Sequence, residues 1–217
     1  MNRPRICASI VDNDLSAIKE VEPFVELFEV RIDLIGEGWP ELIRELGKPW
    51  IACNRLADEG GGWKKSEASR LEELLKATEL GADIVDIELR TKNLDEVVRL
   101  IKKKTKCLLS YHDLRGTPPL DNLKEIIERQ LAVGADICKL VTTANSLEDN
   151  LNVLQLITMF PKEKMVSFAM GSLGYVSRVL CPLVGGYFTY ASIEEGKESA
   201  SGQITVRDLE RLYKMVE

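Results

Sequence analysis

Short runs of aliphatic and β-branched residues alternate along this chain with longer segments in which apolar residues recur every three or four positions. The first pattern is typical of buried parallel strands, and the second is typical of amphipathic helices. Together they predict eight strands, at residues 5–11, 27–33, 50–55, 83–89, 106–113, 137–143, 165–170 and 186–193. Most of these strands are followed by a segment of helical spacing, which indicates βα units repeated along the chain.

Capping residues mark several helix boundaries. Ser66 precedes one apolar stripe and is suited to cap its first turn, while Gly81 follows the same stripe as a helix-ending residue. A second helix ends in the same way at Gly134, and further helices are expected over 145–160 and 205–217. The phrase Gly-Ala-Asp-Ile begins at both glycines, so one helix–glycine–strand junction occurs twice in the chain.

Repeated βα units predict an α/β fold in the form of one (β/α)8 TIM barrel, a single catalytic domain that spans residues 1–217. No linker, low-complexity tract or charge block divides the chain, and its length leaves no room for a second domain. A doubly wound open sheet is the alternative, but no GxGxxG motif follows the first strand.

The charge balance excludes a general binder of nucleic acid. The chain has 29 Lys and Arg against 35 Asp and Glu, a net charge of −6. No apolar stretch approaches the roughly 18 residues that a membrane span needs, and the N-terminal apolar run is too short for a signal peptide. We therefore expect a cytoplasmic protein without a membrane partner, whose five cysteines behave as reduced, small hydrophobic residues.

Charged residues stand at the carboxyl ends of several expected strands, which is where a barrel builds its active site. These residues are Glu29, Arg31 and Asp33 on one face of strand two, Arg55 after strand three with Asp58 and Glu59 in its loop, Asp86 and Glu88 in strand four, His112 in strand five and Lys139 in strand six. His112 is the only histidine, which excludes a multi-histidine metal site.

Lys139 lies between apolar neighbours in its strand, so its amine is expected to be desolvated. Two readings follow. A neutral amine with a lowered pKa would be a nucleophile able to form a Schiff base with a carbonyl. A structural lysine would instead keep its charge and pair with a buried carboxylate, such as Glu88.

His112 is expected to meet Lys139 together with Glu59 and Asp86. A histidine that titrates near neutrality beside an imine would suit removal of a proton α to the original carbonyl. A satisfied core imidazole is the alternative.

Three arginines and one loop could hold an anionic, hydroxylated ligand. Arg31, Arg55 and Arg178 could clamp a carboxylate, because guanidinium groups bind carboxylates through paired hydrogen bonds. The segment 194–205 has the composition of a mobile lid, with Ser199 and Gln203 as hydrogen-bonding groups, or of a flexible connector.

Taken together, these segments resemble the type I 3-dehydroquinate dehydratases of the shikimate pathway. The resemblance rests on FEVRIDL in strand two, Arg55 followed by EGG at 59–61, VDIEL within 84–89, YHD at 111–113, GADICKL around Lys139, MGSLGYVSR ending at Arg178, and the lid SASGQI. These motifs run in order from about residue 5 to the C-terminus. Single motifs of this kind are weak, but seven in register are specific.

The resemblance implies a hydro-lyase that dehydrates 3-dehydroquinate to 3-dehydroshikimate, with no cofactor and no metal. It implies that Lys139 forms an imine with the C3 ketone. His112 then removes a C2 proton and returns it to the departing C1 hydroxyl, a syn elimination, while Glu59 orients His112 and Asp86 is a second acidic neighbour.

The resemblance also implies a set of substrate-binding positions. They are Ser9, Glu29, Arg31, Arg55, Arg178, Ser199 and Gln203, with Arg178 facing the substrate carboxylate and Met170 as a supporting pocket residue. The chain departs from the family pattern at Ser201, where the lid usually has proline, and at Leu114, where an aromatic residue is frequent. Neither departure touches the chemistry, but both bear on lid closure and affinity.

Two other functions fit the same barrel. A class I aldolase also uses a strand-six lysine, although aldolases acting on sugar phosphates need a phosphate site that the loops after strands seven and eight do not offer. A catalytically silent binder of a polyhydroxy acid would have no need of a desolvated lysine. The sequence leaves a homodimer open.

Overall fold

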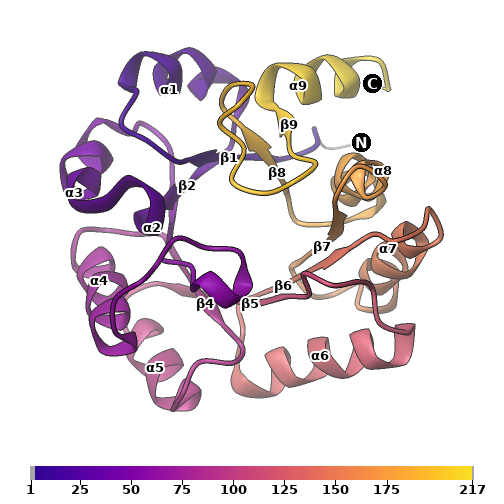
Figure 1. The fold of residues 1–217 in the computed structure, drawn as a ribbon, viewed down its shortest axis with the longest axis horizontal. Coiled ribbons are helices and arrows are strands. Elements are labelled where there is room, and N and C mark those ends of the chain that lie inside the picture. Colours follow the sequence, from indigo (N-terminus) through magenta and orange to yellow (C-terminus); the bar gives the residue numbers. More distant parts are fainter. Residues whose placement is uncertain (1–2, 217) are drawn as a thin grey trace.

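The computed structural model describes residues 3–216, which form one parallel sheet curled into a barrel with the helices around its outside (Figure 1). The strands are β1 (Ile6–Ile10), β2 (Leu27–Arg31), β3 (Trp50–Cys53), β4 (Ile84–Glu88), β5 (Lys106–His112), β6 (Ile137–Thr143), β7 (Met165–Met170), β8 (Thr189–Ser192) and β9 (Ile204–Thr205). The α-helices are α1 (Leu15–Val21), α2 (Ile32–Ile35), α3 (Trp39–Leu42), α4 (Glu67–Glu79), α5 (Leu94–Ile101), α6 (Leu120–Val133), α7 (Asp149–Met159), α8 (Tyr175–Leu180) and α9 (Val206–Lys214). Short 3-10 turns lie at Glu22–Phe24, Gly36–Gly38, Ile43–Glu45, Ala57–Glu59 and Cys181–Val184.

The strand order is β7-β6-β5-β4-β3-β2-β1-β8-β9, so β1 to β7 lie side by side in sequence order and β8 pairs with β1. The barrel closes between β7 and β8, where the N–H of Tyr187, just before β8, donates to the carbonyl of Met165 in β7 at 2.7 Å. The predicted TIM barrel is thereby confirmed. β9 was not expected, because two residues are too few to give a periodic pattern.

The predicted elements agree with the structure except at some ends. The strand expected over 27–33 ends at Arg31, because the chain turns there into α2, and Asp33 therefore lies on a helix and not on the strand face. The predicted caps of α4 are confirmed. The Ser66 side chain accepts the Ser69 N–H at 3.2 Å, and Gly81 follows the helix with φ +91°.

The core has two layers, one inside the barrel and one between the sheet and the helices. Along β6, Cys138 and Leu140 are buried among apolar residues, whereas Lys139 between them lines the pocket inside the barrel. Burial of each large aliphatic side chain contributes about 1.5–3 kcal/mol, so the outer layer supplies much of the stability. All five cysteines are buried and free, as predicted. Over residues 3–216 no helix has the length and apolar character needed to cross a membrane.

Candidate active site

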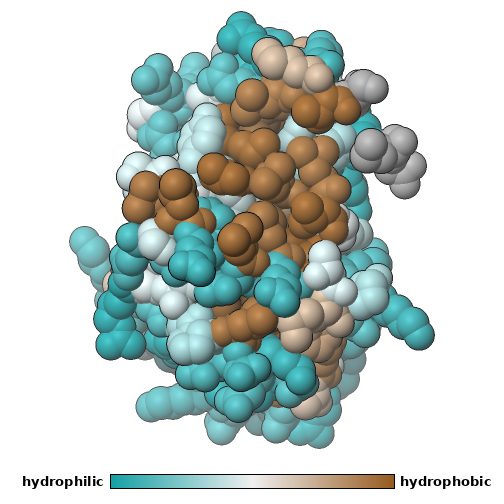
Figure 2. Space-filling view, turned by 90° about the vertical axis from the view of Figure 1, so that its right-hand side faces the viewer, coloured by the Kyte–Doolittle hydropathy of each residue, from teal (hydrophilic) through white to brown (hydrophobic). Residues whose placement is uncertain are grey.

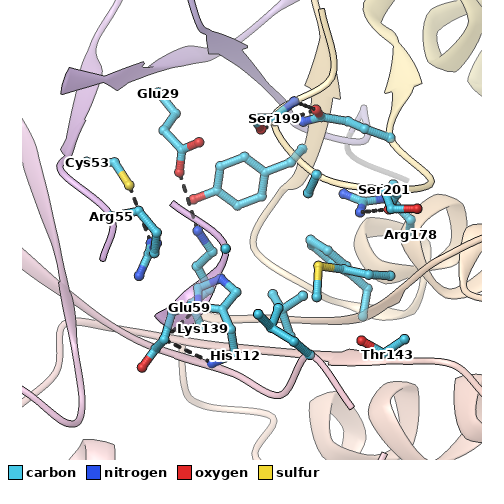
Figure 3. A pocket seen from close by; sticks show the side chains of 18 of the residues that line it. Glu29, Cys53, Arg55, Glu59, His112, Lys139, Thr143, Arg178, Ser199 and Ser201 are labelled. Carbon is cyan, nitrogen blue, oxygen red and sulfur yellow. Dashed lines mark hydrogen bonds and ion pairs between the residues drawn. The ribbon is translucent and has the colours of Figure 1, made fainter. Parts of the chain in front are cut away.

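A pocket of about 340 Å³ opens at the carboxyl ends of the strands, and its lining side chains are shown in Figure 3. Ten of the twelve side chains expected to act in catalysis, binding or support line it: Glu29, Arg31, Arg55, Glu59, His112, Lys139, Met170, Arg178, Ser199 and Gln203. Ser9 and Asp86 lie behind this lining and hydrogen-bond to it. These residues come from β1, β2, β4, β5, β6 and β7, from α8, and from the loops after β3 and β8, and they meet at one end of the barrel.

Lys139 is held by two buried carboxylates. Its Nζ lies 3.0 Å from Asp86 Oδ2 and 3.3 Å from Glu29 Oε1, and Lys139 is 5% exposed. The prediction that Lys139 pairs with Glu88 is wrong. Its carboxylate is bound 2.5 Å from Arg70 Nη1 and 3.4 Å from Arg55 Nη1, which leaves the inner position to Asp86.

In the free protein, Lys139 keeps its charge and pairs with buried carboxylates, which is the second of the two expectations. Burial lowers the pKa of the amine, but Asp86 and Glu29 raise it, and their effect leaves the pKa above its ordinary value. The lysine is therefore an ammonium ion at neutral pH. It must lose a proton before it can add to a carbonyl, and the neighbouring carboxylates are placed to stabilise any cation that replaces the ammonium.

His112 and Glu59 form a hydrogen-bonded pair. The imidazole Nδ1 lies 2.9 Å from Glu59 Oε2, and the same oxygen accepts the His112 backbone N–H at 3.2 Å. Burial, followed by the charges of Arg55 and Lys139, lowers the pKa of His112 well below its ordinary value. The expectation that this histidine titrates near neutrality is wrong, because it remains neutral there. With Nδ1–H directed to Glu59, the basic lone pair is on Nε2.

Glu59 is the member of this pair that titrates near neutrality. Burial raises the pKa of its carboxyl to about 7, against the opposing charge of Arg55. Among the described residues its second oxygen, Oε1, accepts no hydrogen bond, and the Arg90 Nε lies 3.9 Å away. Glu59 therefore changes charge within the physiological range while His112 does not.

Two of the three arginines expected to clamp a carboxylate are already paired. Arg31 binds Asp33 through two bonds, Nε–Oδ1 at 3.0 Å and Nη2–Oδ2 at 2.6 Å. Arg55 contacts Asp86 at 2.5 Å and the Ser110 hydroxyl at 2.5 Å. Asp33 and Asp86 neutralise these two positive charges, so neither guanidinium is free to bind an anion.

Arg178 is different because no carboxylate within residues 3–216 pairs with it. Its side chain is buried, its Nη2 donates to the Ser201 carbonyl at 3.5 Å, and its Nε has no partner among the described groups. The guanidinium lies 4.3 Å from the centre of the Phe168 ring. Burial lowers its pKa to about 10, which still leaves it charged at pH 7. A buried, unpaired cation lining a pocket is suited to receive an anionic ligand.

The segment between β8 and β9 reaches over the barrel end (Figure 1) and is tied down at several points. The Ser199 N–H donates to Gln203 Oε1 at 2.7 Å, and Gln203 Nε2 donates to the Ser9 hydroxyl at 3.2 Å. The Gly171 N–H donates to the Ser201 carbonyl at 3.2 Å. Ser201, in the place of the family's usual proline, thus contributes its carbonyl to the closed loop. The segment covers the pocket, and whether it opens remains a prediction.

Sequence reasoning missed several lining side chains, among them Cys53, Phe168 and Tyr190. Each looks like an ordinary core residue when only its neighbours in sequence are known. The available signal was the two-residue alternation, because Phe168 shares a strand face with Met170.

One cluster brings together groups that can bind metals. Donor atoms of Glu29, Cys53 and Asp86 lie within 4.8 Å of one another. However, Lys139 and Arg55 bind the two carboxylates, and burial raises the pKa of the Cys53 thiol far above neutrality. The cluster is therefore an ion-pair network with a protonated thiol beside it.

Comparison with known proteins links this geometry to a family. The sequence model described as type I 3-dehydroquinase matches residues 6–217. The chain is 42% identical to the 3-dehydroquinate dehydratase of Dehalococcoides mccartyi over 216 residues, covering 100% of the chain and 97% of that protein. It is 38% identical to the enzyme of the same name from Methanocaldococcus jannaschii, covering 98% and 99%. The crystal structure of the 3-dehydroquinate dehydratase from Geobacillus kaustophilus superimposes with a TM-score of 0.85 at 26% identity, covering 99% of this chain and 91% of that one.

Proposed function

The chain belongs to the type I 3-dehydroquinase family, and from this membership we propose that Lys139, His112 and Glu59 carry out its reaction. The activity is that of a hydro-lyase, the dehydration of 3-dehydroquinate to 3-dehydroshikimate through a Schiff base in the shikimate pathway. The substrate is a small molecule.

Lys139 forms the imine. Its nitrogen adds to the C3 ketone, and loss of water leaves a cationic imine. This cation takes the place of the ammonium between Asp86 and Glu29, whose oxygens lie 3.0 and 3.3 Å from Nζ. The carboxylates therefore favour the charged imine, and the charged imine withdraws electrons from the adjacent C2–H bond.

His112 transfers the proton. Its Nε2 removes the C2 proton, and the imidazolium that forms is stabilised by the Glu59 carboxylate at Nδ1. The low pKa of His112 keeps the base free at neutral pH and makes the imidazolium a strong acid. It returns the proton to the C1 hydroxyl on the same face, which leaves as water.

Arg178 anchors the substrate. As a buried cation without a carboxylate among the described residues, it binds the substrate carboxylate, and the loop side chains Ser199 and Gln203 contact hydroxyl groups. Arg31 and Arg55 act through their pairs with Asp33 and Asp86, which orient the polar wall of the pocket. Glu29, Ser9 and Met170 complete it.

One observation carries the assignment. The buried Lys139 amine lies between two carboxylates, and the neutral His112 imidazole, paired with Glu59, lines the same pocket. The test is incubation with 3-dehydroquinate, reduction by borohydride and peptide mapping. We expect an adduct on Lys139 and the enone absorbance of 3-dehydroshikimate. H112A should still form the adduct but lose turnover.

The alternatives give different outcomes in the same experiment. A Schiff-base aldolase would form an adduct without dehydration of this substrate. A silent binder would form neither adduct nor enone. Near-normal turnover in H112A would remove the histidine from its role and leave the imine chemistry intact.

We also propose that two copies of the chain associate through an apolar face. Figure 2 shows an apolar face on the side of the molecule where α7 and α8 lie in Figure 1. Exposed side chains of α7, α8 and the turn after α8 include Leu151, Tyr175, Val176 and Val184. Residues 173–187 contain a single charged residue, Arg178, and its side chain is buried. An apolar surface of this kind is complementary to itself, as a two-fold dimer requires.

We propose the cytoplasm as the site of action and no nucleic-acid partner. Five free, buried cysteines suit a reducing compartment. The net charge of −6 disfavours a phosphate backbone.

A further inference from the structure

The hydroxyl of Tyr190 has no hydrogen-bond partner among the described residues, although it lies in the wall beside Lys139. Tyr190 is 3% exposed, and Lys139 Nζ lies 4.3 Å from the centre of its ring. A phenylalanine would fill the same space without burying an unsatisfied hydroxyl, which destabilises the folded chain. Such a group calls for a ligand atom as its partner.

The ring is held in a fixed orientation. Phe188 packs against it at 5.3 Å between ring centres with an interplanar angle of 77°, and Phe168 packs against it at 6.3 Å and 67°. Edge-to-face packing on two sides restricts the ring, so the hydroxyl is directed by the core and not by a hydrogen bond of its own.

The Tyr190 hydroxyl carries its proton at neutral pH. Burial, followed by the charge of Glu29, raises the pKa of Tyr190 well above its ordinary value, so the phenol keeps its proton. The nearby Glu29 carboxylate already accepts Lys139 through Oε1 and the Ser9 hydroxyl through Oε2. The donor is therefore unused in the free protein.

We propose that the Tyr190 hydroxyl donates a hydrogen bond to the substrate oxygen at the carbon that Lys139 attacks, which makes it a catalytic residue for imine formation. This inference rests on the proposed function. As the nitrogen–carbon bond forms, the carbonyl π pair moves to the oxygen, and Tyr190 stabilises the charge that develops there. The carbon–oxygen bond then breaks. Both protons of the departing water come from the Lys139 ammonium, and Tyr190 ends the step unchanged.

The test compares Y190F with S192A, a matched control on the same strand. The Ser192 hydroxyl is also buried and unpartnered among the described residues, but it does not line the pocket. Each chain is mixed rapidly with 3-dehydroquinate, quenched with borohydride at successive times, and the Lys139 adduct is measured by mass spectrometry. We expect Y190F to form the adduct about 100-fold more slowly, as for loss of one oxyanion donor, and S192A to match the unsubstituted chain.

Equal rates in Y190F and the unsubstituted chain would overturn the role of Tyr190 while leaving the imine mechanism standing. An equal slowing in S192A would also overturn it, because the effect would then follow from disturbing β8. Absence of any adduct in the unsubstituted chain would instead refute the proposed function, and this inference with it. Melting temperatures of the three proteins confirm that each is folded.

Discussion

The Lys139 ammonium lies 3.0 Å from the Asp86 carboxylate, so the proposed nucleophile is stored in the free protein as one half of a buried ion pair. The same carboxylate binds Arg55 at 2.5 Å. The Oδ2 atom of Asp86 thus bridges two cations, and the Asp86 charge raises the pKa of Lys139. An amine held in this way stays protonated at neutral pH, which makes it a poor nucleophile there.

Replacement of Asp86 by asparagine should lower the pKa of Lys139. Asp86 is the main charge that raises this pKa, so D86N leaves a larger neutral fraction of the amine at a given pH. The pH midpoint for reductive alkylation of Lys139 by a small aldehyde should therefore move to lower pH. Peptide mapping across a pH series measures it.

The matched control is E88Q. Glu88 is equally buried but pairs with Arg70 and Arg55, so the midpoint of Lys139 should stay in place. A midpoint that moves equally in both variants would show that the effect comes from loosened packing and not from the Asp86 charge.

The activity should rise with pH through about 7, because Glu59 ionises with a pKa of about 7. Above that value the carboxylate accepts the His112 Nδ1–H and stabilises the imidazolium. Below it, the protonated carboxyl cannot do so. The low pKa of His112 means that the histidine itself adds no titration in this window. A profile of kcat/KM against pH should show one acidic limb near 7.

Two variants test whether ionisation of Glu59 causes the acidic limb of this profile. In E59Q, kcat/KM should be lower and should no longer change with pH near 7, since the amide does not ionise. R90A should move the limb to higher pH, because the Arg90 charge lowers the pKa of Glu59 from 3.9 Å away. A limb that survives in E59Q would belong to another group.

The sequence located most of the candidate site because its charged residues interrupt apolar strands. Lys139 and His112 stand out for that reason alone. Tyr190 could not be recognised in the same way, since an aromatic residue in a strand is normally part of the core.

The ion-pair partners could not be read from sequence. Glu88 and Lys139 both lie opposite Ser110 in the strand register, which makes Glu88 the natural partner on paper. Barrel strands are tilted, however, and Arg70 from α4 binds Glu88, so Lys139 reaches Asp86 instead. The pKa of His112 depends in the same way on Arg55 and Lys139, which reach it from other strands.

Arg178 should matter for binding and little for stability. R178M removes a buried cation that has no carboxylate partner within the described chain, so the free energy of unfolding should stay the same or increase. KM should rise roughly 100-fold, since a charged hydrogen bond contributes about 1.5–3 kcal/mol. Urea unfolding and steady-state kinetics measure the two effects.

Arg70 is the control, a fully buried arginine that pairs with Glu88 and Glu67. R70M should cost about 3–5 kcal/mol, because it removes the nearer of the two cations that pair with the buried Glu88 carboxylate. If R178M destabilised the chain as much as R70M, Arg178 would be a structural residue.

The proposed dimer should dissociate when a charge enters its apolar face. V176D places a carboxylate on the exposed side of α8, where the proposed dimer would bury it, so the chain should sediment as a monomer. L100D is the control, since Leu100 is similarly exposed, at 40% against 47%, but lies on α5. Sedimentation of the unsubstituted chain as a monomer would refute the dimer.

Closure of the loop over the pocket should depend on Gly202. This residue has φ +75°, and a Cβ there would lie 2.5 Å from the Gly171 carbonyl oxygen, so G202A must push the loop away from β7. That shift would displace the Ser201 carbonyl, which accepts the Gly171 N–H, and the adjacent Ser199 and Gln203. KM should rise roughly tenfold, for a loss of about 1.4 kcal/mol of binding.

Gly196 is the control that distinguishes backbone strain from loss of loop closure. It has φ +80° in the same segment, but no atom lies within 4 Å of a Cβ added there. G196A should therefore keep a nearly normal KM, and an equal rise in both variants would show that backbone strain alone, not contact with Gly171, controls the loop.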